Sequence, residues 1–111
     1  MSKQVHPDLG ATQLTTVLAA LSNPVRLGIV RLLSDGSERQ WGELDAPVAP
    51  STLSKHLQVL RSAGLTRTRD EGTRCYVHLR REDIDNRFPG LLDSVLSTAG
   101  SGAADIGVKR P

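Results

Sequence analysis

The sequence predicts one small, mainly α-helical domain with a single β-hairpin, in the order helix, helix, short helix, helix, hairpin, helix. Apolar residues recur at helical spacing in several separate segments. One stretch of period-two alternation surrounds a glycine turn. The length of 111 residues allows one domain and argues against two. No apolar run approaches the ~20 residues that a membrane helix needs, so we expect no membrane partner.

The first two helices are predicted from their apolar stripes and from the residues between them. The first stripe consists of Leu14, Val17, Leu18 and Leu21, and its helix should end near Ser22. Asn23-Pro24 is typical of an N-cap followed by a first-turn proline. The second stripe consists of Val25, Ile29, Leu32 and Leu33, and Ser34-Asp35-Gly36 should end that helix.

The next segment predicts a compressed helix followed by a longer one with a polar outer side. Pro47 and Pro50 leave room for little more than one turn around Trp41. The longer helix starts near Pro50, turns Leu53, Leu57, Leu60 and Gly64 to one face, and ends at Ala63-Gly64. Its outer side is short-chained and polar apart from Val59, as suits a helix that lies close to a hydrated surface.

A basic hairpin and a last helix complete the domain. Residues 65–80 alternate around a Glu71-Gly72-Thr73 turn, with Cys75, Val77 and Leu79 on one face of the second strand. The last helix begins at Glu82-Asp83, and Pro89-Gly90 should kink or restart it. We therefore place the domain at residues 11–97, between a flexible arm (1–10) and a disordered tail (98–111) rich in Gly, Ala and Ser.

Charge is distributed unevenly along the chain. The net charge is +2, but residues 50–81 hold seven basic against two acidic side chains, or +5, and the flanking segments are slightly acidic. A concentrated basic stretch suggests a polyanion-binding surface, although a solvated charged face is the simpler alternative. We find no paired catalytic carboxylates, glycine-rich phosphate loop or nucleophile with its base, so we do not expect an enzyme. The single cysteine and the lack of an apolar leader after Met1 suggest a reducing cytoplasm.

This order of elements predicts a helix-turn-helix followed by a wing, a DNA-binding arrangement. Short polar side chains on the fourth helix let its backbone approach base edges in the major groove, while the hairpin arginines contact phosphates. The predicted contacts with double-stranded DNA are Ser51, Thr52, Ser54, Lys55, His56 and Gln58 on the helix, and Arg67, Arg69 and Arg74 on the hairpin.

Three runs of sequence carry a resemblance to a known family. They are Ala20-Leu21-Ser22-Asn23-Pro24-Val25-Arg26-Leu27, the stretch from Ser51-Thr52-Leu53-Ser54-Lys55-His56-Leu57 to Ala63-Gly64-Leu65, and Gly72-Thr73-Arg74. Residues 12 to 96 resemble the ArsR/SmtB family of bacterial winged-helix transcriptional regulators. The resemblance implies a cytoplasmic homodimer that reads a roughly twofold operator and usually represses until an effector binds. It also implies an interface through the first and last helices, at Leu14, Val17, Leu18, Leu21, Leu91, Leu92, Val95 and Leu96. The alternative for these residues is the core of one chain.

The chain departs from the family's metal motifs. Where some members have C-x-C, this sequence has Trp41-Gly42-Glu43-Leu44-Asp45-Ala46, and in place of D-x-H it has Asp83-Ile84-Asp85. Carboxylates alone suit zinc or nickel poorly, so we predict no metal site and no cofactor. The effector could be a metal recruited by histidines across a dimer, a redox signal, an organic ligand or a protein. The alternative function is an interaction module that acts through a second regulatory protein carrying the effector site.

Four single residues allow more than one interpretation. His56 could support the fold by an internal hydrogen bond or face a phosphate. Cys75 is favoured as a small buried hydrophobe over a redox-sensing thiol, which would need exposure and a lowered pKa. Trp41 is favoured as a core anchor over a platform for a ligand, and His78 as an exposed side chain.

Overall fold

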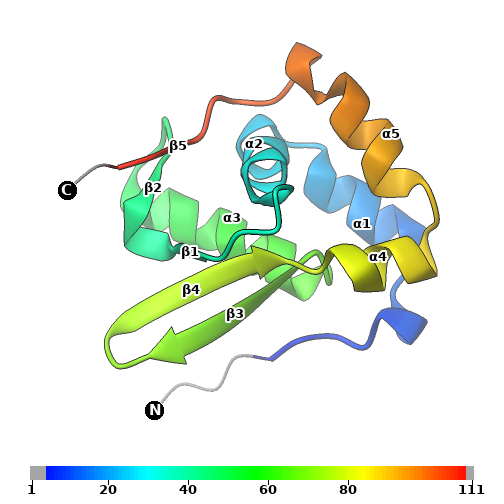
Figure 1. Cartoon of the computed structure of the whole chain (residues 1–111), viewed down its shortest axis with the longest axis horizontal. Coiled ribbons are helices and arrows are strands. Elements are labelled where there is room, and N and C mark those ends of the chain that lie inside the picture. The colour runs from blue at the N-terminus through cyan, green and yellow to red at the C-terminus, as the bar shows by residue number, and fades with distance from the viewer. Residues whose placement is uncertain (1–4, 110–111) are drawn as a thin grey trace.

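Two helices that meet at a sharp bend begin the fold. The computed structural model describes residues 5–109. After a 3-10 turn, η1 (Leu9–Ala11), α1 (Leu14–Leu21) and α2 (Pro24–Leu33) follow, bent by 100° at their junction (Figure 1). Asn23 caps α2 as predicted, because its side-chain oxygen accepts hydrogen bonds from the backbone N–H groups of Val25 and Arg26. Within the described residues no single helix is long and apolar enough to cross a membrane, and α1 and α2 reach that length and apolarity only as a bent pair.

The predicted short helix between α2 and the next long helix is a single 3-10 turn between two short strands. These elements are β1 (Arg39–Gln40), η2 (Trp41–Glu43) and β2 (Leu44–Asp45). A Glu43 carboxylate oxygen accepts from the backbone N–H of Gln40 at 2.8 Å, which closes the turn. The compression follows from Pro47 and Pro50, which leave no room for a regular helix.

The long helix α3 (Pro50–Ser62) has the predicted first-turn proline and the predicted buried side. Leu53, Leu57 and Leu60 are buried in the core. The helix ends before Gly64, whose φ of +85° lies in the left-handed region. Leu9 of η1 packs on this glycine so closely that a Cβ there would lie 2.2 Å from its Cδ2 atom.

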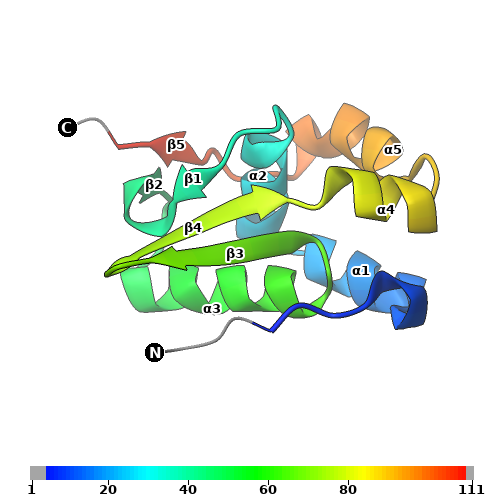
Figure 2. The ribbon, with the colours of Figure 1, turned by 60° about the horizontal axis from the view of Figure 1, so that its bottom comes forward.

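The hairpin of β3 (Thr66–Glu71) and β4 (Arg74–Leu79) runs alongside α3, with its turn at the same end of the molecule as the start of α3 (Figure 2). β1 pairs with the free edge of β4, which gives the order β1-β4-β3. Thr66 and Thr68 lie opposite Leu79 and Val77 and are buried with them, so the core side of β3 consists of threonines.

The last helix is interrupted where the sequence predicts it. α4 (Arg81–Arg87) and α5 (Leu91–Thr98) are separated by Phe88, Pro89 and Gly90, and Gly90 has a φ of +82°. α1 and α5 lie at the same end of the molecule, opposite the turn of the hairpin (Figures 1 and 2). The core joins all helices to the hairpin through the fully buried side chains of Val17, Ile29, Leu33, Leu57, Leu60, Leu65, Val77, Ile84 and Leu92.

Parts of both ends that the sequence predicts to be flexible are packed against the fold in the structure. In the arm, Leu9 is buried, His6 Nε2 accepts from the backbone N–H of Thr68 at 2.9 Å, and Arg80 donates to the carbonyl of Pro7. The arm's first four residues, like residues 110–111 of the tail, lie outside the described part.

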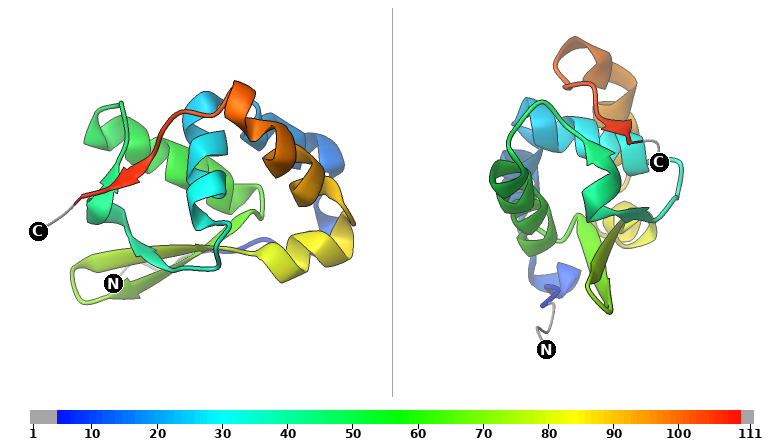
Figure 3. Two further views of the ribbon diagram at one scale, coloured as in Figure 1. Left: turned by 45° about the horizontal axis from the view of Figure 1, so that its top comes forward. Right: turned by 90° about the vertical axis from the view of Figure 1, so that its left-hand side faces the viewer.

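The tail is not disordered over residues 98–109. After η3 (Ala99–Ser101), residues 102–109 cross α2 and end in β5 (Gly107–Val108), which pairs with β2 (Figure 3). We call this segment the C-terminal strap. Ala104 and Ile106 pack against the core, and the N–H of Ala104 donates to the carbonyl of Pro24 at 2.9 Å.

Candidate nucleic-acid interface

The outer side of α3 presents the polar surface that the sequence predicts. Ser51, Thr52, Lys55 and Gln58 are exposed, whereas Ser54 is half-buried. The packing of three leucines on the opposite side fixes the direction in which these side chains project. Lys55 forms no ion pair within residues 5–109, so its charge is available to a ligand.

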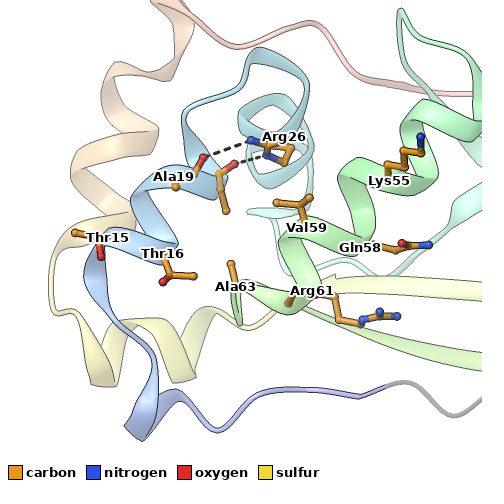
Figure 4. Close-up of a pocket in the computed structure, with 11 residues that line it drawn as sticks. Thr15, Thr16, Ala19, Arg26, Lys55, Gln58, Val59, Arg61 and Ala63 are labelled. Carbon is orange, nitrogen blue, oxygen red and sulfur yellow. Dashed lines mark hydrogen bonds between the residues drawn. The ribbon is translucent and has the colours of Figure 1, made fainter.

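A basic groove of about 770 Å³ lies between α1 and this side of α3. Figure 4 shows Val59 and Ala63 pointing toward α1, and Lys55, Gln58 and Arg61 extending away from it. Three basic side chains, Arg26, Lys55 and Arg61, line the groove, and no carboxylate is among the described residues that line it. The groove therefore favours an anionic occupant over a cationic one.

His56 is held inside the fold, which favours the structural interpretation over DNA contact. Its Nδ1 atom lies 3.1 Å from Nη1 of Arg26. Because a guanidinium can only donate, Nδ1 accepts and the ring proton is on Nε2. Burial and the charge of Arg26 lower the pKa of His56, so the ring is uncharged at neutral pH and is a poor partner for a phosphate.

Arg26, whose role the sequence did not reveal, joins three helices. From α2 its Nε donates to the carbonyl of Ala20 at 2.7 Å and its Nη2 to that of Ala19, at the end of α1 (Figure 4). These bonds are in addition to the contact with His56 on α3. It therefore adds a donor at the end of α1, where the helix leaves carbonyl groups without intrahelical partners, and the carbonyl of Ala19 also accepts from Ser22. The arginine and the histidine are 30 positions apart, so local pattern cannot reveal the pair.

The three hairpin arginines differ in what they contact. Arg67 and Arg74 are exposed and form no ion pair within the described residues. Arg69 is bound to Glu38 at 2.7 Å and to Glu71 at 2.6 Å, and its guanidinium lies 4.5 Å from the ring centre of Tyr76. Both carboxylates raise the pKa of Arg69. Arg69 thus ties the hairpin to the segment before β1, and Arg67 and Arg74 are the arginines left for phosphates.

The eight predicted interface residues fall into three groups. Val17, Leu21 and Leu92 are core residues of the single chain, with exposed fractions of 0%, 6% and 0%. Leu91, Val95 and Leu96 are half-buried against the core. Leu14 and Leu18 remain 44% and 42% exposed, one turn apart on α1, so they carry the apolar surface that a partner could cover.

The carboxylates at the position of the D-x-H motif of the family that the sequence resembles are paired with arginines. Asp83 contacts Arg80 at 3.1 Å, and Asp85 contacts Arg81 at 3.0 Å. Arg81 also binds Asp93. Across residues 5–109, no three His, Cys, Asp or Glu side chains gather closely enough to hold a metal ion.

Cys75 is half-buried on the core-facing side of β4, and its Sγ donates to a carboxylate oxygen of Asp70 at 2.9 Å. Burial, with that hydrogen bond, raises the pKa of the thiol to about 11. A raised pKa suppresses the reactive thiolate, which argues against a redox-sensing role.

Sequence comparisons find relatives among bacterial regulators. A helix-turn-helix domain family matches residues 21–69. The chain is 37% identical over 82 residues to the uncharacterized HTH-type transcriptional regulator YceK of Bacillus subtilis, covering 71% of this chain and 82% of the relative. It is 35% identical over 98 residues to the HTH-type transcriptional regulator Rv0324 of Mycobacterium tuberculosis, covering 85% of this chain but 43% of that protein. It is 36% identical over 74 residues to the biofilm growth-associated repressor of Agrobacterium fabrum, covering 65% and 62%.

Solved structures of similar fold are also described as regulators. A possible transcriptional regulatory protein from Mycobacterium bovis (fragment 1–100) is 34% identical, with a TM-score of 0.58, covering 76% of this chain and 90% of that one. A possible transcriptional regulator for arsenical resistance is 26% identical, with a TM-score of 0.57, covering 83% and 99%. These neighbours confirm the winged helix-turn-helix fold predicted from the sequence.

Proposed function

Because the chain belongs to the family of helix-turn-helix-type transcriptional regulators, we propose that it is a homodimeric, sequence-specific repressor of the ArsR/SmtB type that binds double-stranded DNA in the cytoplasm. Transcriptional regulators are not enzymes. The observation that carries the proposal is the exposed polar side of α3 beside a hairpin with two unpaired arginines. The similarity to a structure described as an arsenical-resistance regulator supports the type, and the A. fabrum relative supports repression.

The proposal divides the interface by role. Ser51, Thr52, Lys55 and Gln58 read base edges in the major groove, with Ser54 at the border of that surface. Arg67 and Arg74 anchor the hairpin on phosphates. His56 supports the interface from within the fold, and Arg69 supports it through its ion pairs with Glu38 and Glu71; neither contacts DNA.

Titration of labelled DNA from the gene's own upstream region, followed by fluorescence anisotropy at two salt concentrations, tests these roles. Arg74→Ala should weaken binding to all sequences and reduce the salt slope by about one. Lys55→Ala should weaken the upstream DNA more than unrelated DNA. Arg31→Ala is the matched control, since Arg31 lies on α2 and its ion pair is with the fully exposed Asp105.

Unchanged affinity in both Lys55→Ala and Arg74→Ala would contradict this assignment of the interface. Weak binding without sequence preference, lost on adding salt, would favour the interaction module that works through a second regulatory protein.

The proposal of a homodimer is based on the exposed leucines of α1. The helix α1, which carries the exposed Leu14 and Leu18, lies at the same end of the molecule as α5, where a second copy could bury both leucines. Leu14→Glu with Leu18→Glu should give a monomer in sedimentation experiments and lower the affinity for a twofold operator. Val5→Glu, at a residue 74% exposed, is the control and should leave the mass unchanged. A dimer that survives the double substitution would contradict this interface.

A further inference from the structure

A second cavity, of about 310 Å³, lies on the core side of α3, between this helix and the segment of η2 and β2. Small-molecule sites typically start at about this volume. Its larger apolar lining residues are Trp41, Leu44, Val48, Leu53 and Leu57. Leu44, Leu53 and Leu57 also belong to the hydrophobic core, so packing holds the wall in place.

Two opposite charges also line this cavity. Asp45 lies on β2 and Lys109 at the end of the C-terminal strap, and both side chains are exposed. Neither is in an ion pair with any residue from 5 to 109, although both line one cavity. The hydroxyl of Ser54 on α3 adds a neutral polar group. An apolar cavity with one free anion and one free cation is complementary to a molecule that carries both charges on an apolar body.

The position of Lys109 is fixed by the strap. Its backbone N–H donates to the carbonyl of Glu43 at 2.6 Å, directly after the pairing of Val108 with Leu44. The backbone that carries this cation is therefore held beside β2 by the strap (Figure 3).

We propose that this cavity binds a small amphipathic zwitterion with the chemistry of an apolar α-amino acid. Its ammonium group pairs with Asp45, its carboxylate with Lys109, and its side chain packs against Trp41 and Leu53. Because Leu53 and Ser54 belong to α3, binding of the zwitterion changes the affinity of that helix for DNA. This effect on DNA binding rests on the proposed function. By linkage, DNA changes the affinity for the zwitterion by the same factor.

Trp41 is the only tryptophan of the chain and lines the cavity, so its fluorescence reports occupancy without any DNA. The probes are L-leucine and L-phenylalanine, with phenylethylamine and 3-phenylpropionate as analogues that carry one charge. We expect a saturable change in Trp41 emission with both amino acids, and at least tenfold weaker binding of both single-charge analogues. Binding that does not saturate, or equal binding of L-phenylalanine and its analogues, would overturn the proposal.

Substitutions test whether the amino acid binds in this cavity or elsewhere on the surface. Asp45→Asn and Lys109→Gln should each raise the Kd for L-phenylalanine several-fold, and Ala46→Phe, which fills the cavity from its wall, should abolish binding. Glu82→Gln, at an exposed carboxylate of α4, is the matched control and should leave the Kd unchanged. Because Ala46→Phe could perturb folding, the two charge variants decide the outcome. Unchanged Kd values in both would overturn the site.

Adding the amino acid to the anisotropy titration then tests its effect on DNA binding. A shift in DNA affinity that disappears in Lys109→Gln supports the effector role, and an unchanged affinity at saturating amino acid overturns it. If the chain binds no DNA, the proposed function fails, while the fluorescence titration still decides whether the cavity binds a zwitterion.

Discussion

Replacing Gly28 by alanine should destabilise the protein, because the C-terminal strap lies directly against this position. Gly28 is buried in α2. A Cβ atom there would lie 2.3 Å from the carbonyl oxygen of Ala104 and 2.8 Å from Cγ1 of Ile106. The Ile106 side chain could rotate, but the Ala104 oxygen belongs to the backbone, so the strap itself must move.

Two opposing effects determine how much Gly28→Ala changes the free energy of unfolding. In an open helix, Gly→Ala stabilises by about 1 kcal/mol. Displacing the strap loses the hydrogen bonds from Ala104 to Pro24 and from Lys109 to Glu43, each worth about 1 kcal/mol net. It also exposes the half-buried Ile106, which costs about 1 kcal/mol more. We therefore expect Gly28→Ala to lower the free energy of unfolding by about 2 kcal/mol.

Urea denaturation of the full chain and of a chain ending at Gly102 measures this effect. In the shortened chain the strap is gone, so Gly28→Ala should stabilise by up to about 1 kcal/mol. The substitution should therefore change sign between the two backgrounds. The same sign and size in both would refute the packing of the strap on α2.

Three further predictions concern single side chains. Asn23→Ala should lower the free energy of unfolding by about 1 kcal/mol in urea denaturation, since two backbone N–H groups lose their cap. Asn23→Asp should retain most of the stability, because its carboxylate can also cap the helix. Equal losses in the two variants would contradict the cap. For His56, whose pKa the fold lowers from 6.5, the unfolded chain takes up the proton first as the pH falls. Its contribution to stability is therefore complete above pH 6.5 and is lost as the pH falls below that value toward the lowered pKa. Thermal unfolding of His56→Gln should accordingly depend less on pH in this range than that of the unchanged chain, and an equal pH dependence in both proteins would show that the fold does not lower the pKa of His56. Because the pKa of Cys75 is raised to about 11, alkylation by iodoacetamide at about pH 8 should be on the order of 100-fold slower than that of free cysteine, and a comparable rate would show that the thiol is not held protonated.

Elements with strong local signals were predictable from the sequence. Asn23-Pro24 places the start of α2, Leu53, Leu57 and Leu60 give the buried side of α3, and Pro89-Gly90 marks the break before α5. In each case the residues that determine the element lie within it or next to it. The exposed polar side of α3 follows from the same periodicity.

What the sequence did not reveal depends on contacts between distant segments. The strap contains isolated apolar residues in a Gly- and Ala-rich stretch that has no helical or strand periodicity. It is ordered only because α2 and β2 provide a surface on which it packs. Leu9 in the arm is buried for the same reason, against Gly64. Arg69 and Glu38 are 31 positions apart, so alternation could predict an exposed arginine but not the carboxylate that binds it.

The contacts of Arg26 determine how the three helices around it open. One guanidinium binds the end of α1 and the middle of α3 from its place on α2, so neither α1 nor α3 can move away from α2 without breaking a hydrogen bond to Arg26. The slowly exchanging amides of α1, α2 and α3 should therefore exchange with solvent deuterium as one cooperative unit, with a shared opening free energy. In Arg26→Gln that unit should divide, and α1 should exchange ahead of the other two helices.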